Sequence, residues 1–254
     1  MAKVAIVTGG ARGIGRGCAL ALARRGLDIA LVDLLAPEME RTAGEIEALG
    51  RRALQFEADV ADFARAQEVA DAVFAAFGRL DVLVNNAGKA QPKGILEIAE
   101  DEFDRTIAIN LKSCFNYVRA CVPHMRSGGP REPGSGRIVS MSSLNALSGG
   151  VTAAVSRFAY ASAKAGILGM TRALAKELGP DILVNAICPG LIQTELAKNH
   201  VIIERGAALA KNGIAAGRVG TVQDVAEVVA FLTTSEPCFI TGQEIIVDGF
   251  QYHV

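Results

Sequence analysis

Tyr160 and Lys164 are the residues whose types and spacing most clearly suggest chemistry. They lie four positions apart in the stretch YASAK, a spacing that puts two side chains on one face of a helix. An ammonium beside a phenol stabilises the phenolate, which turns a poor acid into a usable acid–base group. Such pairs also arise by chance on exposed helices, so the meaning of this pair depends on the elements that position it.

A glycine-rich turn near the N-terminus has the composition of a phosphate-binding loop. It reads TGGARGIG over residues 8–15, directly after an apolar run and before a helical pattern. Glycines let the backbone approach a pyrophosphate closely, while a helix N-terminus presents free N–H groups. The spacing differs from the common G-x-G-x-x-G fingerprint. Its position at the first strand-to-helix turn of an α/β pattern nevertheless indicates a nucleotide site.

Asp33 ends the second apolar run, 18 residues after Gly15. An acidic side chain there can accept hydrogen bonds from the ribose hydroxyls of an adenosine, although Asp also commonly caps turns. A 2′-phosphate beside it would bring two like charges to about 4 Å, which costs on the order of 4 kcal/mol at an effective dielectric constant near 20. Asp33 therefore favours NAD over NADP, whereas Arg12 could pair with a 2′-phosphate and favours the opposite. Asp33 is given more weight, so NAD is the expected cofactor.

Short apolar runs alternate with longer amphipathic stretches along the whole chain. The runs predict strands at Val4–Val7, Ile29–Val32, Val82–Val84, Ile138–Val139, Leu183–Ile187 and Ile245–Val247. The amphipathic stretches predict helices near 13–26, 38–49, 62–77, 97–123, 157–178 and 222–233. This alternation predicts a Rossmann-type α/β fold, a doubly wound parallel sheet in three layers that forms a single domain over residues 1–254. Residues 127–136 are expected to form an exposed loop.

The composition favours an enzyme or a small-molecule binder. The chain of 254 residues is 50% hydrophobic and has a net charge of −1, which disfavours a nucleic-acid partner and disorder. The five cysteines and three histidines are scattered, so neither a disulfide framework nor a metal site is expected. The N-terminus lacks a signal-peptide pattern, and no apolar run is long enough to cross a bilayer. A cytoplasmic protein without a membrane partner is therefore expected.

Further motifs follow one another in order along the chain. They are Thr8-Gly9-x3-Gly13-x-Gly15, Asp59-Val60, Asn85-Asn86-Ala87-Gly88, Asn110, Ser142-Ser143, Tyr160-x3-Lys164, Pro189-Gly190, Thr241-Gly242-Gln243 and Val247-Asp248-Gly249. Together they resemble the short-chain dehydrogenase/reductase family, in its compact single-domain branch. The resemblance spans nearly the whole chain. It implies hydride transfer with a nicotinamide cofactor and a homo-oligomer, a dimer or tetramer built partly from the helices near 97–123 and 157–178.

The resemblance also implies roles at the reacting centre. Tyr160 is expected to be the acid–base residue, and Lys164 to support it and hold the nicotinamide ribose. Ser143 aligns best with the hydroxyl that orients the substrate, with Ser142 as the alternative. Asn110 resembles an asparagine that kinks its helix and holds a water for proton relay to the lysine.

The cofactor contacts implied by the resemblance come from several loops. Asp59 is expected to accept from the adenine amine, and Asn85 to pack beside the adenosine ribose and hold the central sheet. Ile192 and Thr194 are expected to contact the carboxamide and diphosphate. The complete expected set is Gly9, Arg12, Gly13, Ile14, Gly15, Asp33, Asp59, Val60, Asn86, Ala87, Gly88, Tyr160, Lys164, Pro189, Gly190, Ile192 and Thr194. Residues 191–214 are expected to include a lid over the substrate.

One departure from the family pattern concerns the spacing before the tyrosine. Ser143 lies 17 residues before Tyr160, whereas the family usually places this serine about four residues nearer. Residues 144–155 therefore read as a small insertion beside the substrate.

Three functions are compatible with these patterns. The leading hypothesis is an NAD(H)-dependent oxidoreductase that interconverts a secondary alcohol and a ketone, and the other two are alternatives. The second is an NADPH-dependent 3-oxoacyl-thioester (acyl-carrier-protein) reductase. The third, of a different class, is a non-catalytic scaffold that senses a dinucleotide, but such a protein has no need of Tyr160, Lys164 and Ser143 together. A serine hydrolase is disfavoured because no Gly-x-Ser-x-Gly motif occurs.

Overall fold

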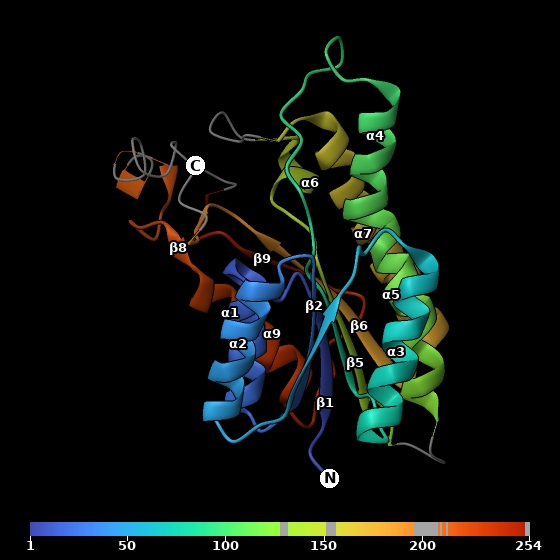
Figure 1. The fold of residues 1–254 in the computed structure, drawn as a ribbon. Helices are drawn as coiled ribbons and strands as arrows, with labels where there is room; N and C mark the ends of the chain where they lie inside the picture. Colours follow the sequence, from blue (N-terminus) through green and yellow to red (C-terminus); the bar gives the residue numbers. More distant parts are fainter. Residues whose placement is uncertain (128–131, 151–155, 196–207, 209, 212, 252–254) are drawn as a thin grey trace.

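The computed structural model describes residues 1–127, 132–150, 156–195, 208, 210–211 and 213–251 (Figure 1). Within them, seven parallel strands form one sheet in the order β3-β2-β1-β4-β5-β6-β9. The strands are β1 (Val4–Thr8), β2 (Asp28–Asp33), β3 (Ala53–Glu57), β4 (Val82–Asn85), β5 (Gly136–Met141), β6 (Ile182–Pro189) and β9 (Glu244–Val247), and β7 (Ile192–Gln193) pairs separately with β8 (Gly220–Thr221). The helices are α1 (Gly13–Arg24), α2 (Ala36–Ala48), α3 (Phe63–Phe77), α4 (Glu100–Ile107), α5 (Ser113–Arg126), α6 (Asn145–Ser148), α7 (Phe158–Leu178) and α9 (Val222–Thr234), with a π-helical turn η1 (Ala108–Lys112) between α4 and α5.

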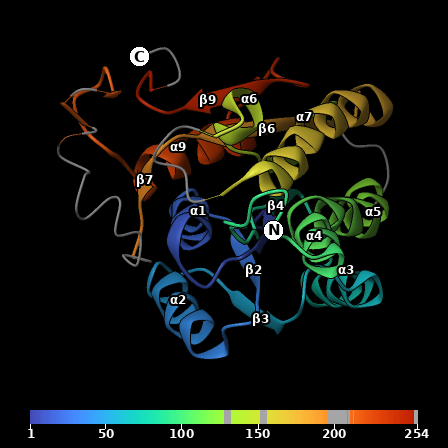
Figure 2. The same cartoon turned by 90° about the horizontal axis from the view of Figure 1, so that it is seen from above.

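Helices cover both faces of the sheet. Figures 1 and 2 show α1, α2 and α9 on one face and α3, α5 and α7 on the other, and α1 packs against α9 as α3 packs against α5. The three layers follow from the pattern of the strands. All five residues of β1 are buried, as are the residues of β4 and β5, because parallel strands covered on both faces have no solvent side.

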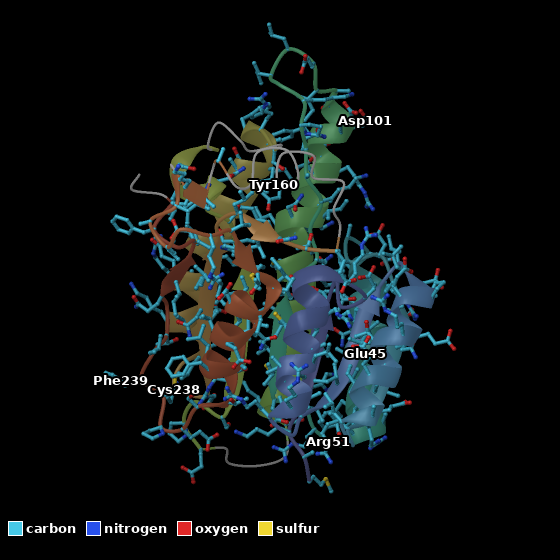
Figure 3. The ribbon with its side chains drawn as sticks, turned by 90° about the vertical axis from the view of Figure 1, so that its left-hand side faces the viewer. Glu45, Arg51, Asp101, Tyr160, Cys238 and Phe239 are labelled. Carbon is cyan, nitrogen blue, oxygen red and sulfur yellow. The ribbon has the colours of Figure 1, made fainter. Side chains whose placement is uncertain are left out.

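The strand order creates a crevice at the carboxyl ends of the strands. The chain moves outward in one direction from β1 to β3 and then returns to place β4 on the other side of β1. The loops that leave the carboxyl ends of β1 and β4 therefore diverge, which is where α/β sheets of this kind bind ligands. In Figure 1 this end of the sheet is uppermost, and Figure 3 shows Tyr160 at the same end.

The predicted fold class is confirmed, but several elements differ from the prediction. β3 was not predicted, because it lies at the sheet edge and has the polar residues Gln55 and Glu57 in a partly exposed sequence. The helix predicted near 97–123 begins at Glu100, is interrupted by the π-helical turn and continues to Arg126. The short helix α6 and the β7–β8 pair were also not predicted.

Parts of some predictions lie outside the described residues. These are residues 128–131 of the predicted exposed loop, 151–155 of the apparent insertion, and most of 191–214. Among the described residues, no helix combines the length and the apolar character that crossing a bilayer requires. The described part of the chain also contains no cluster of three or more side chains suited to holding a metal ion.

Candidate active site

A cleft of about 670 Å³ opens at the carboxyl ends of the strands. Its walls come from the loops after β1, β2, β3, β4, β5 and β6 and from α7. The expected residues that line it are Gly9, Arg12, Gly13, Ile14, Asp33, Asp59, Val60, Asn86, Ala87, Gly88, Ser143, Tyr160, Lys164, Pro189, Gly190, Ile192 and Thr194. Gly15 and Asn110 were also expected at the site, and they are not among the lining residues.

The loop between β1 and α1 leaves room for a phosphate. Arg12 is the N-cap residue of α1, and its side chain makes no capping hydrogen bond, so the N-cap side chain does not occupy the first N–H groups of the helix. Gly13 has a φ of +57°, which favours glycine. A Cβ atom on Gly13 would also lie 3.8 Å from Thr194 across the cleft.

Gly15 has a packing role in this loop. A Cβ atom at this position would lie 1.9 Å from the carbonyl oxygen of Gly9 and 2.4 Å from Nδ2 of Asn86. The first turn of α1 can therefore approach the loop only because residue 15 lacks a side chain. Gly15 is buried and supports the loop without lining the cleft.

Asp33 is held rigidly at the end of β2. Its Oδ2 accepts a hydrogen bond from the backbone N–H of Ala11 at 3.1 Å, and its Oδ1 accepts from Leu34 and Leu35 at 2.8 and 3.3 Å. The carboxylate therefore bridges the phosphate loop and the start of the next connection. It lines the cleft and is only partly buried, so it can still accept from a ribose.

Asp59 and Arg105 form an ion pair at the same end of the cleft. Arg105 Nη2 lies 2.6 Å from Asp59 Oδ2, and the N–H of Ala61 donates to Asp59 Oδ1 at 3.0 Å. Partial burial alone would raise the pKa of Asp59, but the Ala61 amide and the Arg105 guanidinium outweigh it and lower that pKa below its usual value. The carboxylate is therefore ionised at neutral pH.

Asn85 and Asn86 are neighbours in the sequence but contact different parts of the structure. Asn85 is buried, and its Nδ2 donates to Ser140 Oγ on the neighbouring strand β5, so it holds the sheet as expected but does not line the cleft. Asn86 Nδ2 donates to the carbonyl oxygens of Thr8 and Gly9 at 3.0 and 3.1 Å. The asparagine that reaches the cleft and fixes the phosphate loop is thus Asn86. The two side chains differ in this way because successive residues along an extended segment point to opposite sides.

Tyr160 and Lys164 share one face of α7, as their spacing predicts. Lys164 Nζ lies 5.7 Å from the centre of the Tyr160 ring, and it donates to the carbonyl oxygen of Met141 at 2.7 Å. Lys164 is 3% exposed, whereas Tyr160 is partly exposed to the cleft. The lysine is therefore fixed from behind by the end of β5, with the phenol in front of it.

The two serines at the end of β5 are not equivalent. Ser142 is buried, and its Oγ donates to the carbonyl oxygen of Lys164 at 2.8 Å. Ser143 is partly exposed, and its Oγ accepts from the N–H of Asn145 at 3.2 Å. Because Ser143 can still donate its own proton, it is the better candidate for contact with a substrate, although both line the cleft.

Asn110 lies behind the reacting residues, in the π-helical turn. Its Oδ1 accepts from the N–H of Lys89, and its Nδ2 donates to the carbonyl oxygens of Lys89 and Thr106, all at 3.0 Å. The side chain is fully buried. It also lies next to Lys164, since a Cβ atom on Gly88 would be 3.0 Å from Asn110 Oδ1 and 3.4 Å from Lys164 Nζ. A π-helical turn interrupts the helix at this residue.

The loop after β6 closes the cleft opposite α7. The N–H of Gly190 donates to Val247, and the N–H of Leu191 donates to the side chain of Gln251 at 3.0 Å. Ile192 is buried, while Thr194 is partly exposed above the phosphate loop. These contacts hold the loop in position beside Tyr160.

Some of the lining residues were not among those expected at the site. Beyond the expected set and Ser142, they are Leu34, Leu35, Ala58, Lys89, Ala90, Arg105, Ile109, Met141, Ser156 and Leu191. Arg105 is the clearest omission, because it is charged and reaches Asp59 from α4, 46 positions along the chain. A lone arginine on an amphipathic helix normally indicates a solvated face, so no signal in the sequence identifies it.

The parallel sheet, the uncapped helix at a glycine loop and the acidic residue after β2 define an α/β protein of the dinucleotide-binding class. A family model described as Enoyl-(Acyl carrier protein) reductase matches residues 9–249. Among curated proteins, the chain is 37% identical to an uncharacterized short-chain type dehydrogenase/reductase of Sinorhizobium fredii, over 97% of this chain and 96% of that protein. It is 35% identical to the 3-oxoacyl-(acyl-carrier-protein) reductase FabG of Thermotoga maritima, over 97% and 96% of the two chains.

The solved structures agree with this assignment. A short-chain type dehydrogenase/reductase from Mycobacterium marinum superposes with a TM-score of 0.87 at 28% identity, over 98% of this chain and 95% of that one. Levodione reductase superposes with a TM-score of 0.87 at 29% identity, over 98% and 97% of the two chains. The chain belongs to the short-chain dehydrogenase/reductase family, and it is an NAD(P)-dependent oxidoreductase. The non-catalytic scaffold is therefore not retained.

Proposed function

We propose that the enzyme interconverts a secondary alcohol and a ketone, with Tyr160 as the acid–base residue. The observation that carries this proposal is the convergence of Tyr160, Lys164 and Ser143 on one cleft, with Lys164 behind the phenol. A carbonyl oxygen that becomes an alcohol needs a proton donor and hydrogen-bond donors that stabilise its developing charge. Tyr160 supplies the proton, and Ser143 donates to the same oxygen.

Residues at both ends of the cleft are suited to holding a dinucleotide cofactor. The uncapped N-terminus of α1 and Gly13 leave space for a diphosphate. A Cβ atom on Gly13 would reduce the space between residue 13 and Thr194. When bound, a nicotinamide supplies the hydride acceptor or donor. Lys164 is held behind Tyr160 by the hydrogen bond that its Nζ donates to the carbonyl oxygen of Met141. Asn110 fixes the Lys89 backbone beside Lys164, and a water held there would complete the path for the proton.

The proposed cofactor is NAD rather than NADP. Asp33 presents a carboxylate fixed by three backbone N–H groups at the adenosine end of the cleft. The negative charge of a 2′-phosphate there would be repelled by the Asp33 carboxylate. The side chain cannot rotate away without losing its three hydrogen bonds. Arg12, which is exposed at the edge of the same cleft, is the residue that would favour NADP.

A second candidate is an NADPH-dependent 3-oxoacyl-thioester reductase. It is favoured by Arg12 and by the similarity to FabG of Thermotoga maritima. The chain is also 34% identical to the 2-dehydro-3-deoxy-D-gluconate 5-dehydrogenase of Escherichia coli, over 97% and 94% of the two chains, so similar sequences are named for different substrates. A screen of secondary alcohols, polyols, steroids and 3-hydroxyacyl thioesters with NAD and with NADP separates the two candidates.

Replacement of the phenol tests the mechanism. Tyr160→Phe removes only the hydroxyl and is expected to lower kcat by about 10²–10⁴-fold on the substrate found in the screen, with NADH binding, followed by its fluorescence, changed much less. Tyr117→Phe is the matched control, because the Tyr117 hydroxyl is buried in α5, has no hydrogen-bond partner among the described residues and lies outside the cleft. Near-full hydride transfer in Tyr160→Phe would refute the proposed role.

We also propose a homo-oligomer, a dimer or tetramer that includes α5 and α7. Phe115 on α5 is 47% exposed and stacks on the equally exposed Phe63, with ring centres 5.9 Å apart. Exposed aromatic patches of this kind are typical of protein–protein contacts. Light scattering tests the oligomeric state.

Residues 191–214 remain a proposed substrate lid, of which Leu191 and Ile192 line the cleft.

A further inference from the structure

The ion pair between Arg105 and Asp59 crosses one end of the cleft. Arg105 comes from α4, whereas Asp59 comes from the loop between β3 and α3, and both line the cleft. Their side chains remain 49% and 36% exposed, so the pair is at the surface of the cleft rather than within the core. The carboxyl ends of β2 and β3 mark this end as the adenosine end.

The carboxylate of Asp59 has acceptor capacity left over. Its Oδ1 accepts one hydrogen bond from Ala61, and its Oδ2 accepts one from Arg105. A carboxylate offers about four acceptor positions, so two remain. Asp59 can therefore hold Arg105 and accept from a ligand amine at the same time, and Arg105 does not need to leave when a ligand arrives.

The surroundings of Arg105 suit a flat ring. The lining residues near the pair include the apolar side chains of Ala58, Val60 and Ile109, which offer an adenine contact surface but no charge. A guanidinium is planar and packs face to face on an aromatic ring while keeping its in-plane hydrogen bonds. Arg105 can do so with its position already set by Asp59.

We propose that Arg105 is an adenine-binding residue, whose guanidinium, held by Asp59 across the adenosine end of the cleft, packs on the face of the base. The proposal rests on dinucleotide binding by this family member and not on the choice between NAD and NADP, since both carry adenine. The competing explanation is an ion pair that only attaches α4 to the loop after β3. Exposed pairs of that kind contribute little to stability.

The test measures binding rather than turnover. Arg105→Met keeps the length of the side chain but removes the charge and the plane, and it is expected to raise the Kd for NADH by about 5-fold. The Kd for ADP-ribose, measured by calorimetry, should rise by the same factor, because the lost contact is in the adenosine half. Arg105→Lys keeps the charge without the flat face, so its Kd should remain closer to that of Arg105→Met than to that of the wild type.

Arg65→Met is the matched control. Arg65 lies nearby on α3, pairs with Glu68 at 2.8 Å and is similarly exposed, but it does not line the cleft. Its loss should leave both Kd values unchanged. An Arg105→Met protein with unaltered Kd values, or with tighter binding because Asp59 has been released, would overturn the proposal. So would a Kd for Arg105→Lys equal to that of the wild type. Failure of the NAD preference at Asp33 would leave these results untouched.

Discussion

The two ends of the cleft hold their polar side chains in different ways. At the reacting end, Lys164 and Asn110 are 3% and 0% exposed, and they bond to main-chain groups of β5, of the loop after β4 and of α4. At the adenosine end, Asp59 and Arg105 are partly exposed and bond largely to each other. One end is built into the core, and the other is assembled on the surface of loops.

This difference has an energetic consequence. A buried polar group that loses its partner costs about 1–3 kcal/mol, because water has no access to replace the hydrogen bond. An exposed pair that is lost is replaced by water, and its contribution is less than about 1 kcal/mol. Substitutions at the reacting end should therefore change both stability and chemistry, whereas those at the adenosine end should change mainly which cofactor binds and how tightly.

The largest effect is expected at Asn110. Asn110→Leu keeps the volume but leaves three main-chain groups, at Lys89 and Thr106, without their partner. We expect the free energy of unfolding to fall by roughly 3 kcal/mol, because buried unpaired groups of this kind cost about 1–3 kcal/mol each and the structure can relax around some of them. The melting temperature should then fall by about 6–12 °C, as followed by circular dichroism.

Asn116→Leu provides the comparison within the same long helical segment. Asn116 is also fully buried, but within the part of the chain that the structure describes its side chain makes a single hydrogen bond, from Nδ2 to the carbonyl oxygen of Val60 at the adenosine end, and its Oδ1 has no partner there. Its loss should cost clearly less stability than that of Asn110. Equal losses would mean that the two ends do not differ in the way that their hydrogen bonds indicate.

The sequence predicts the two ends of the cleft with different success. The i, i+4 spacing of Tyr160 and Lys164 places both on one helix face, and the structure keeps them there, because local helix geometry decides it. The pairing of Asp59 with Arg105 depends on how α4 packs beside the loop after β3. No local pattern carries that information.

The same distinction applies to the fold. The strands at the centre of the sheet were predicted because burial on both faces makes them apolar throughout. The edge strand β3 was missed, since its exposed positions carry polar residues. The partition of roles between Asn85 and Asn86 depends on which of two neighbouring residues turns into the sheet, and a motif alone does not specify that.

Substitution of Asp33 is expected to have an effect of intermediate size, on the choice of cofactor. Asp33→Asn removes the charge but keeps an oxygen that can accept from Ala11 or from Leu34. We expect the preference for NAD over NADP, as a ratio of Kd values, to fall by about 10–100-fold. The full repulsion at ~4 Å is on the order of 4 kcal/mol, and solvent screening reduces it. Asp33→Ala serves as the comparison, because it also removes the acceptor that holds the phosphate loop and should weaken binding of both cofactors. If Asp33→Asn leaves the ratio unchanged, another residue sets the preference.

The smallest effect is expected at Asp59, where the pH dependence separates the charge from the rest of the side chain. The pKa of Asp59 in the folded protein lies below its usual value, and a carboxylate with a lowered pKa stabilises the fold above its unfolded pKa of about 3.9. That contribution is lost as the pH falls through the folded-state pKa. The difference in melting temperature between wild type and Asp59→Asn should therefore be constant from pH 7 to about pH 5 and shrink below about pH 4. It should correspond to less than about 1 kcal/mol and decrease with added salt, because the ion pair is exposed. A difference as large as that of Asn110→Leu, or one that persists unchanged at pH 3, would show that the adenosine end is as firmly built into the core as the reacting end.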